Sequence, residues 1–181
     1  MAVSTPNYAT NASTTISVGA PWVDFNNAIG PDDSVNTYSQ LAFSYTDELR
    51  LTHTVVLPEG SVLNGIRYFV RCLFTGVTVS PQIHVYNAVD LDFLGQATVS
   101  KSGLDWITAG STSYAYGMTI ASLAAGHVVT IFMEGDNDIS EFGYVDAAYM
   151  EVTYTPPPTG NRKMKLFKRV RAVRRRGNAG R

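Results

Sequence analysis

Three histidines and one short acidic run are the residues of this chain best suited to metal or acid–base chemistry. The histidines are His53, His84 and His127, and each falls in or beside a different segment of alternating apolar and polar residues. A zinc site would require them to converge with a carboxylate. Histidines that are partnered in a core or on a surface fit the same pattern. We therefore predict neither a histidine metal site nor a cofactor.

The acidic run offers oxygen ligands for a hard cation. The candidate calcium ligands are Asp136, Asp138 and Glu141, with Asn137 and Ser140 between them. Calcium binds such oxygens, although this run lacks the full spacing of an EF-hand loop. The alternative is a polar turn between two strands, and the sequence leaves both interpretations open.

No motif indicates a catalytic nucleophile. Serine is abundant, but no Gly-x-Ser-x-Gly elbow or comparable context accompanies it. The single cysteine, Cys72, excludes an intrachain disulfide and a cysteine-based zinc site. We expect a protein that is not an enzyme and has no catalytic residues.

Several aromatic residues offer a platform for sugar rings. They are Trp22, Trp106, Tyr114, Tyr116, Tyr144, Tyr149 and Tyr154. In a β-sandwich, aromatic residues more often fill the core or an interface. Carbohydrate binding is therefore an alternative function at this point.

The charge distribution is the strongest compositional signal. Ten of the fourteen Lys and Arg residues lie in residues 162–181, which contain no acid. Residues 1–155 carry four basic and fifteen acidic residues, a net charge of −11. The formal net charge of −1 therefore conceals an acidic body with a basic tail, a distribution typical of an interaction tail.

Apolar residues are interleaved in the basic tail at helical spacing, which predicts an apolar stripe on a short helix. A nucleic-acid arm needs charge alone, whereas apolar residues favour a protein groove. A solvated tail and a contact with DNA remain alternatives. The predicted partner-binding residues are Arg162, Lys163, Met164, Lys165, Leu166, Phe167, Lys168, Arg169, Val170, Arg171, Val173, Arg174, Arg175 and Arg176.

The elements that must position these residues are strands. Apolar and polar residues alternate with period two over most of residues 38–155. The expected strands are residues 14–18, 38–45, 49–57, 66–74, 82–89, 94–99, 113–118, 128–134 and 147–155, with one helical turn at 121–125. Many short strands with regular turns predict an all-β fold, an antiparallel β-sandwich of jelly-roll-like type.

The predicted domain organisation has four parts. Residues 1–13 form an N-terminal arm, 14–155 the sandwich, 156–161 a proline-rich linker, and 162–181 the basic tail. Consecutive prolines cannot donate ladder hydrogen bonds, which ends the last strand. No secretory signal and no apolar run long enough to cross a bilayer is visible, so we expect synthesis in a cytoplasm.

The order of motifs resembles that of single-domain β-sandwich structural proteins of tailed bacteriophages and prophages. The first matching block comprises residues 21–22, 26–28, 32–33, 39–41 and 56–66, the last including the turn Pro58-Glu59-Gly60. The second comprises residues 116–117, 139–143 and 145–154. Leu63 departs from the pattern, the central segment is short, and the basic tail lies outside the resemblance.

The resemblance implies a virion component with no catalytic residues. We expect a capsid decoration or cement protein, present in many copies or as a homo-oligomer. Its tail would anchor it to neighbouring virion proteins, such as the major capsid protein or other copies. A glycan-binding module on the virion is the first alternative, and a head–tail, tail or internal DNA-contacting protein is the second. A membrane partner is not expected.

Overall fold

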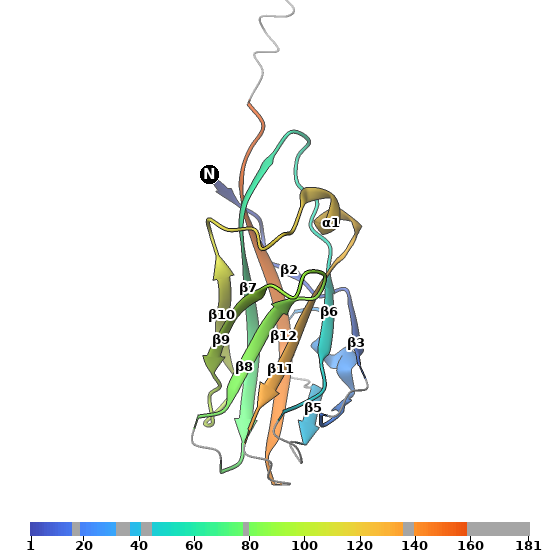
Figure 1. The fold of residues 1–181 in the computed structure, drawn as a ribbon, viewed down its shortest axis with the longest axis vertical. Helices are drawn as coiled ribbons and strands as arrows, with labels where there is room; N and C mark the ends of the chain where they lie inside the picture. The colour runs from blue at the N-terminus through green and yellow to red at the C-terminus, as the bar shows by residue number, and fades with distance from the viewer. Residues whose placement is uncertain (16–18, 32–36, 41–44, 78–79, 136–139, 159–181) are drawn as a thin grey trace, which may run out of the picture.

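Two antiparallel sheets pack face to face in the computed structural model, which describes residues 1–15, 19–31, 37–40, 45–77, 80–135 and 140–158 (Figure 1). The seven-stranded sheet has the order β10-β7-β12-β5-β4, with β1 and β2 paired to β12, and the five-stranded sheet has the order β3-β6-β11-β8-β9. The predicted antiparallel β-sandwich is confirmed. Among the described residues, no helix is long and apolar enough to cross a membrane.

The elements have the following bounds. The seven-stranded sheet contains β1 (Ala2–Val3), β2 (Asn7–Tyr8), β4 (Trp22–Val23), β5 (Thr37–Gln40), β7 (Val62–Thr75), β10 (Asp105–Ser111) and β12 (Phe142–Thr155). The five-stranded sheet contains β3 (Asn11–Thr14), β6 (Leu49–His53), β8 (Gln82–Asn87), β9 (Phe93–Thr98) and β11 (His127–Glu134). A 3₁₀ turn, η1 (Phe25–Ala28), and one short helix, α1 (Ile120–Ala125), complete the described elements.

The two longest strands, β7 and β12, form the centre of the seven-stranded sheet. In β7 the residues from Ile66 to Phe74 alternate as predicted, with the even-numbered side chains fully buried and the odd-numbered ones half-buried on the outer face. Burial of a large apolar side chain stabilises the fold by about 1.5–3 kcal/mol. The alternation of β12 changes phase at a bulge between Val145 and Ala147, where Asp146 forms an ion pair with Arg71.

The predicted helical turn is confirmed as α1. Thr119 caps it: its hydroxyl accepts from the backbone N–H of Ser122, whose hydroxyl accepts from the N–H of Thr119. Leu123 fixes the turn against the sandwich because its side chain is fully buried in the core.

Three sequence-based expectations differ from the structure. The strand expected over residues 49–57 ends at His53, the last residue of β6. Residues 113–118 do not form a strand: the strand in this region is β10, and Tyr116 and Gly117 both have positive φ, which breaks an extended ladder. Residues 1–13, expected to form an arm, contribute β1, β2 and most of β3, whose backbones pair with β12 and β6.

The histidines are placed by these strands, and two of them meet in the interior. His53 and His127 are cross-strand partners. The Nδ1–H of His53 donates to the carbonyl of Asn7 (2.9 Å), and its Nε2 accepts from the hydroxyl of Tyr68 (2.7 Å). His127 donates from Nε2 to the side-chain oxygen of Asn87 (2.9 Å). Among the described residues, no group of three or more potential metal ligands converges.

The interior position of His53 predicts a pH-dependent stability. Burial lowers the pKa of His53 from 6.5 to about 4, so the folded protein keeps the ring neutral while the unfolded chain takes up a proton. The contribution of His53 is fully present above pH 6.5 and is lost as pH falls towards 4, by about 3 kcal/mol. Urea unfolding between pH 7 and pH 4 should show this loss.

Ring carbon shifts of His53 followed by NMR test the same point without a mutation. We expect the shifts to stay at their neutral values at pH 5.5. Titration of the ring near pH 6.5 in the folded protein would contradict the prediction.

Candidate functional site

The segment before β6 has one residue more than the stretch of β11 opposite it. This irregularity leaves a hollow in the outer face of the five-stranded sheet. Leu49 of β6 is paired with Ile131 of β11, and the next bridge between these chains joins Tyr45 to Glu134. Residues 46–48 therefore lie opposite only two residues of β11. An extra residue of this kind leaves the ladder and bends the strand.

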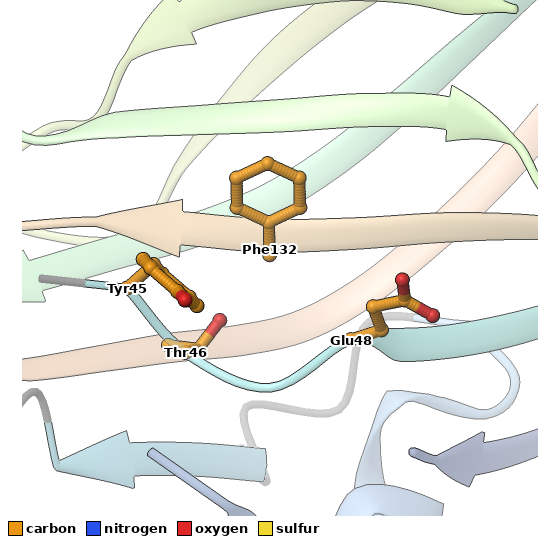
Figure 2. A pocket seen from close by; sticks show the side chains of 4 residues that line it. All are labelled: Tyr45, Thr46, Glu48 and Phe132. Atoms are coloured by element: carbon orange, nitrogen blue, oxygen red, sulfur yellow. The ribbon is translucent and has the colours of Figure 1, made fainter. Parts of the chain in front are cut away.

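The hollow is a pocket beside Phe132, the β11 residue that faces outward at this point. It has a volume of about 230 Å³ and is lined by Tyr45, Thr46, Glu48 and Phe132. Figure 2 shows Phe132 rising from its strand, with Tyr45 and Thr46 on one side of the hollow and Glu48 on the other. Tyr45 is 40% exposed, so its ring is available to a ligand.

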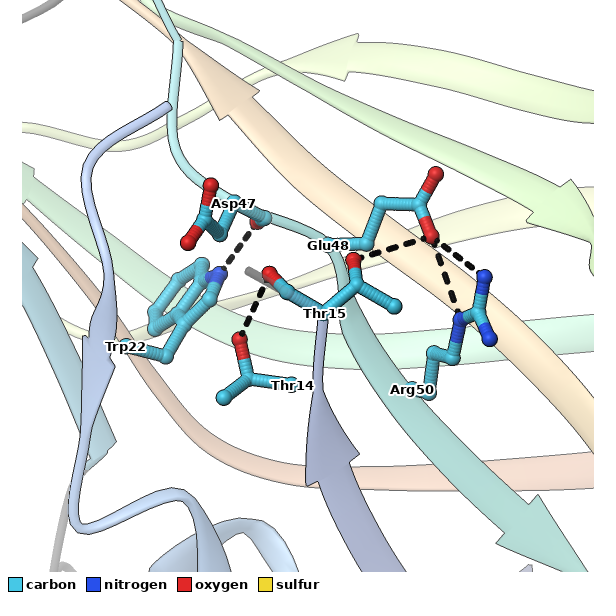
Figure 3. A network of polar contacts seen from close by, with 6 residues as sticks. All are labelled: Thr14, Thr15, Trp22, Asp47, Glu48 and Arg50. Atoms are coloured by element: carbon cyan, nitrogen blue, oxygen red, sulfur yellow. Dashed lines mark hydrogen bonds and ion pairs between the residues drawn. The ribbon is translucent and has the colours of Figure 1, made fainter. Parts of the chain in front are cut away.

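The irregular segment is held in place from the side of β4. The indole N–H of Trp22 donates to the carbonyl of Asp47 (2.7 Å), and the backbone N–H of Gly19 donates to the Asp47 carboxylate (3.1 Å). The N–H of Asp47 donates in return to the carbonyl of Ala20 (2.7 Å). The bond from Gly19 helps to satisfy the side chain of Asp47, a residue that is only 2% exposed, and Figure 3 shows the bond from Trp22 to the Asp47 carbonyl.

Glycine is required at position 19 by this close approach. A Cβ on Gly19 would lie 2.6 Å from the carbonyl carbon and oxygen of Thr46 and 2.7 Å from the nitrogen of Asp47. These are backbone atoms, so a larger residue at position 19 must displace the irregular segment itself.

The carboxylate of Glu48 is fixed through one of its two oxygens. Oε2 accepts from Nε and Nη2 of Arg50 (3.1 and 2.8 Å) and from the hydroxyl of Thr15 (3.2 Å). In Figure 3 all three dashed lines meet at that oxygen, and the other oxygen points away from them. Within the part of the chain that is described, Oε1 has no hydrogen-bond partner, which leaves it able to accept from a ligand.

An aromatic row extends the pocket along the outer face of the sheet. The ring of Phe132 is stacked with His84 (centroids 4.8 Å apart, planes 8° apart) and with Tyr86 (5.6 Å, 10°). Phe93 of β9 continues the row beside Tyr86 (5.1 Å). Nε2 of His84 lies 3.1 Å from the Glu134 carboxylate, so polar groups border the row. The row therefore places apolar ring surface and polar groups side by side next to the pocket.

The aromatic residues proposed from the sequence do not form one platform. Trp22 is buried and supports the pocket from behind. Trp106 and Tyr149 lie on the other sheet, where their rings are 5.1 Å apart. The remaining four are scattered: Tyr114 and Tyr116 contact each other in the loop after β10, Tyr144 lies beside Tyr38 of β5, and Tyr154 packs against the core.

Two other predicted sites lie partly or wholly outside the described residues. Of the candidate calcium ligands, Asp136 and Asp138 lie outside the described residues, while Glu141 is fully buried. All predicted partner-binding residues of the basic tail also lie outside the described residues, so that site stays a prediction.

The pocket residues Tyr45, Glu48 and Phe132 were not predicted as a site. One signal was present: Asp47 occupies the inward phase of the alternation that continues through Leu49. A carboxylate at a core position needs local hydrogen-bond donors, which a regular ladder does not supply. An interrupted strand at residue 47 could have been inferred from that position.

The comparisons with known proteins identify no family. No protein-family model and no curated protein matches the sequence. Among solved structures, the CBM36-1 domain of a multidomain xylanase from the hindgut metagenome of Trinervitermes trinervoides is similar over 82% of this chain and 94% of its own, at 9% identity and a TM-score of 0.45.

Two further structures are similar at the same level. TmCBM61, determined with β-1,4-galactotriose, is 14% identical over 77% of this chain and 86% of its own, with a TM-score of 0.40. The enzymatically active domain of bacteriophage CBA120 tailspike protein 4 is 8% identical over 81% of this chain and 19% of its own, with a TM-score of 0.38. Similarities this distant assign no function, and they identify no family of phage structural proteins.

The close approach at Gly19 generates a stability prediction. Gly19→Ala should lower the free energy of unfolding by about 1–3 kcal/mol, because the added methyl group overlaps backbone atoms. Gly103→Ala is the matched control, since a Cβ there meets no atom within 4 Å. Urea denaturation of both variants measures the difference, and equal stability of the two would contradict the described contact.

Proposed function

We propose that this protein is a saccharide-binding module that does not turn its ligand over. The observation that supports the proposal is the pocket lined by the rings of Tyr45 and Phe132 and by the anchored carboxylate of Glu48, whose Oε1 has no hydrogen-bond partner among the described residues. A sugar ring has an apolar C–H face that packs on aromatic rings and hydroxyl groups that donate to a carboxylate. Ligand pockets combine these elements, mostly apolar walls with a few placed polar groups.

The volume of the pocket and its charged groups limit the class of ligand that can bind. At about 230 Å³ it is smaller than the roughly 300–1,000 Å³ of typical ligand pockets, which fits one sugar ring with its neighbours lying along the aromatic row. Among the described residues that line the pocket, Glu48 is the charged one, and it is paired with Arg50. Because the guanidinium of Arg50 is already engaged by Glu48, a phosphate or another strongly anionic ligand would meet a carboxylate in the pocket lining, so neutral hydroxylated rings are favoured.

Binding of the full chain to a glycan array, followed by calorimetry on the strongest ligand, tests the proposal. Tyr45→Ala and Glu48→Gln should each weaken binding about tenfold or more, equivalent to about 1.4 kcal/mol, because one removes a wall and the other a charged acceptor. Tyr114→Ala is the matched control, since Tyr114 is 58% exposed in the loop after β10 and does not line the pocket.

Either of two results would contradict the proposal. The first is an array on which no saccharide binds above background. The second is a ligand whose affinity is unchanged in both pocket variants while the Tyr114→Ala control alone weakens it.

A structural role in a virion is the second candidate function, and the charge partition of the sequence favours it. A body of net charge −11 joined to a basic, apolar-interleaved tail is suited to anchoring on neighbouring subunits. On this hypothesis the protein is a decoration or cement protein located in the virion, with other virion proteins as partners. The two roles are compatible, because an anchored decoration protein can also display a glycan site.

Particle assembly tests the second candidate. A chain that ends before residue 162 should not be incorporated into particles, whereas Glu48→Gln should be incorporated normally. Normal incorporation of the shortened chain would contradict an anchoring role for the tail.

A further inference from the structure

The outer face of the seven-stranded sheet carries a second aromatic cluster, on the opposite side of the sandwich from the pocket. Tyr149 of β12 is its centre: Phe69 of β7 stacks on it (4.5 Å, 12°), Trp106 of β10 meets it edge-on (5.1 Å), and Tyr8 of β2 lies 5.4 Å away. All four side chains are half-buried or exposed. We refer to Tyr8, Phe69, Trp106 and Tyr149 as the aromatic face.

Ion pairs border the aromatic face on both sides along the strands. Arg67 is paired with Glu151 (2.6 Å), and its guanidinium lies over the ring of Phe69, 5.2 Å from the centroid. Arg71 is paired with Asp146 on the other side. Trp, Tyr and Arg are the residue types that dominate binding energy at protein interfaces.

The charges on this face select the kind of partner. Residues 1–155 contain four basic residues against fifteen acidic ones, and two of the four, Arg67 and Arg71, lie here. Like charge keeps copies of such an acidic body apart over most of its surface. On this face each guanidinium is matched by a carboxylate, so repulsion between two copies is least where the apolar area is concentrated.

We propose that the aromatic face is the interface of a symmetric dimer of this chain. A two-fold axis parallel to the strands, between β7 and β12, places the two sheets face to face. Because Arg67 lies on one strand and Glu151 opposite it on the other, this axis puts Arg67 of each copy against Glu151 of the other. The same patch then serves both copies, as a closed two-fold contact requires.

The dimer leaves both saccharide pockets accessible. Each pocket lies on the five-stranded sheet, which faces away from the interface in this arrangement. Two pockets on one rigid particle would raise the avidity for a repeating glycan. The interface does not depend on the proposed saccharide site, so the failure of one proposal leaves the other standing.

Sedimentation velocity of the full chain tests the interface. We expect a dimer that dissociates on dilution, and it should persist in about 0.5 M NaCl, which screens contacts between exposed charges of the tail and the body. Trp106→Asp should give a monomer, because it places a carboxylate among the aromatic rings of the contact. Tyr114→Asp, in an exposed loop outside the face, should remain a dimer.

A charge exchange tests the two-fold arrangement at about 0.15 M salt, where exposed charges still interact. Arg67→Glu alone sets Glu against Glu across the axis, and Glu151→Arg alone sets Arg against Arg, so each variant should be monomeric. An equimolar mixture of the two variants restores both opposite-charge contacts and should dimerise.

Three results would overturn the proposal. They are a wild-type monomer at every concentration, a Trp106→Asp variant that dimerises like the wild type, and a mixture of the two charge variants that stays monomeric. If Trp106→Asp lost saccharide binding but sedimented with the same mass as the wild type, the aromatic face would be assigned to ligand binding. That result would also contradict the dimer.

Discussion

The need to satisfy the buried carboxylate of Asp47 is the constraint on which the candidate site depends. An unpaired charge in a sandwich interior costs several kcal/mol, so this side chain must find donors. The backbone N–H of Gly19 donates to this carboxylate, and the indole N–H of Trp22 donates to the main-chain carbonyl of Asp47. Together with the bond from the Asp47 N–H to the carbonyl of Ala20, these bonds hold Asp47 away from β11, and the pocket beside Phe132 lies at this interruption of the ladder.

The two outer faces of the sandwich differ in shape and in the polar groups that they carry. The five-stranded face is hollowed where its ladder is interrupted, and its polar groups stand at the edge of the hollow. On the seven-stranded face Phe69 is paired with Tyr149 beyond the bulge between Val145 and Ala147, and the aromatic rings form one cluster. A hollow with a placed acceptor suits a small ligand, whereas a ring cluster bordered by matched charges suits another protein surface.

Much of the fold could be predicted from the sequence because alternation reports burial directly. The inward set from Ile66 to Phe74 and the short helix near Leu123 are where the pattern places them. Residues 113–118 were misassigned because their alternation is local, whereas the positive φ of Tyr116 depends on contacts with Asn87, distant in the sequence. Short edge strands such as β2 carry almost no pattern and form by pairing with β12.

The site was harder to predict because its residues are separated in the sequence. Tyr45 and Glu48 lie in one segment, Phe132 in another, and Gly19 and Trp22, which hold the first segment, in a third. Aromatic residue type alone indicated a platform, but only the sheet register shows which rings share a face. Trp22, one of the seven aromatic candidates, is a buried support.

The most direct test of the account is an NMR titration of the isotope-labelled full chain with the saccharide that binds it most tightly. We expect the backbone shift changes to centre on residues 45–48 and on Phe132, with the amides of Trp106 and Tyr149 unaffected. Changes centred on Trp106 and Tyr149 instead, or spread over the surface without a maximum at the interrupted strand, would contradict it.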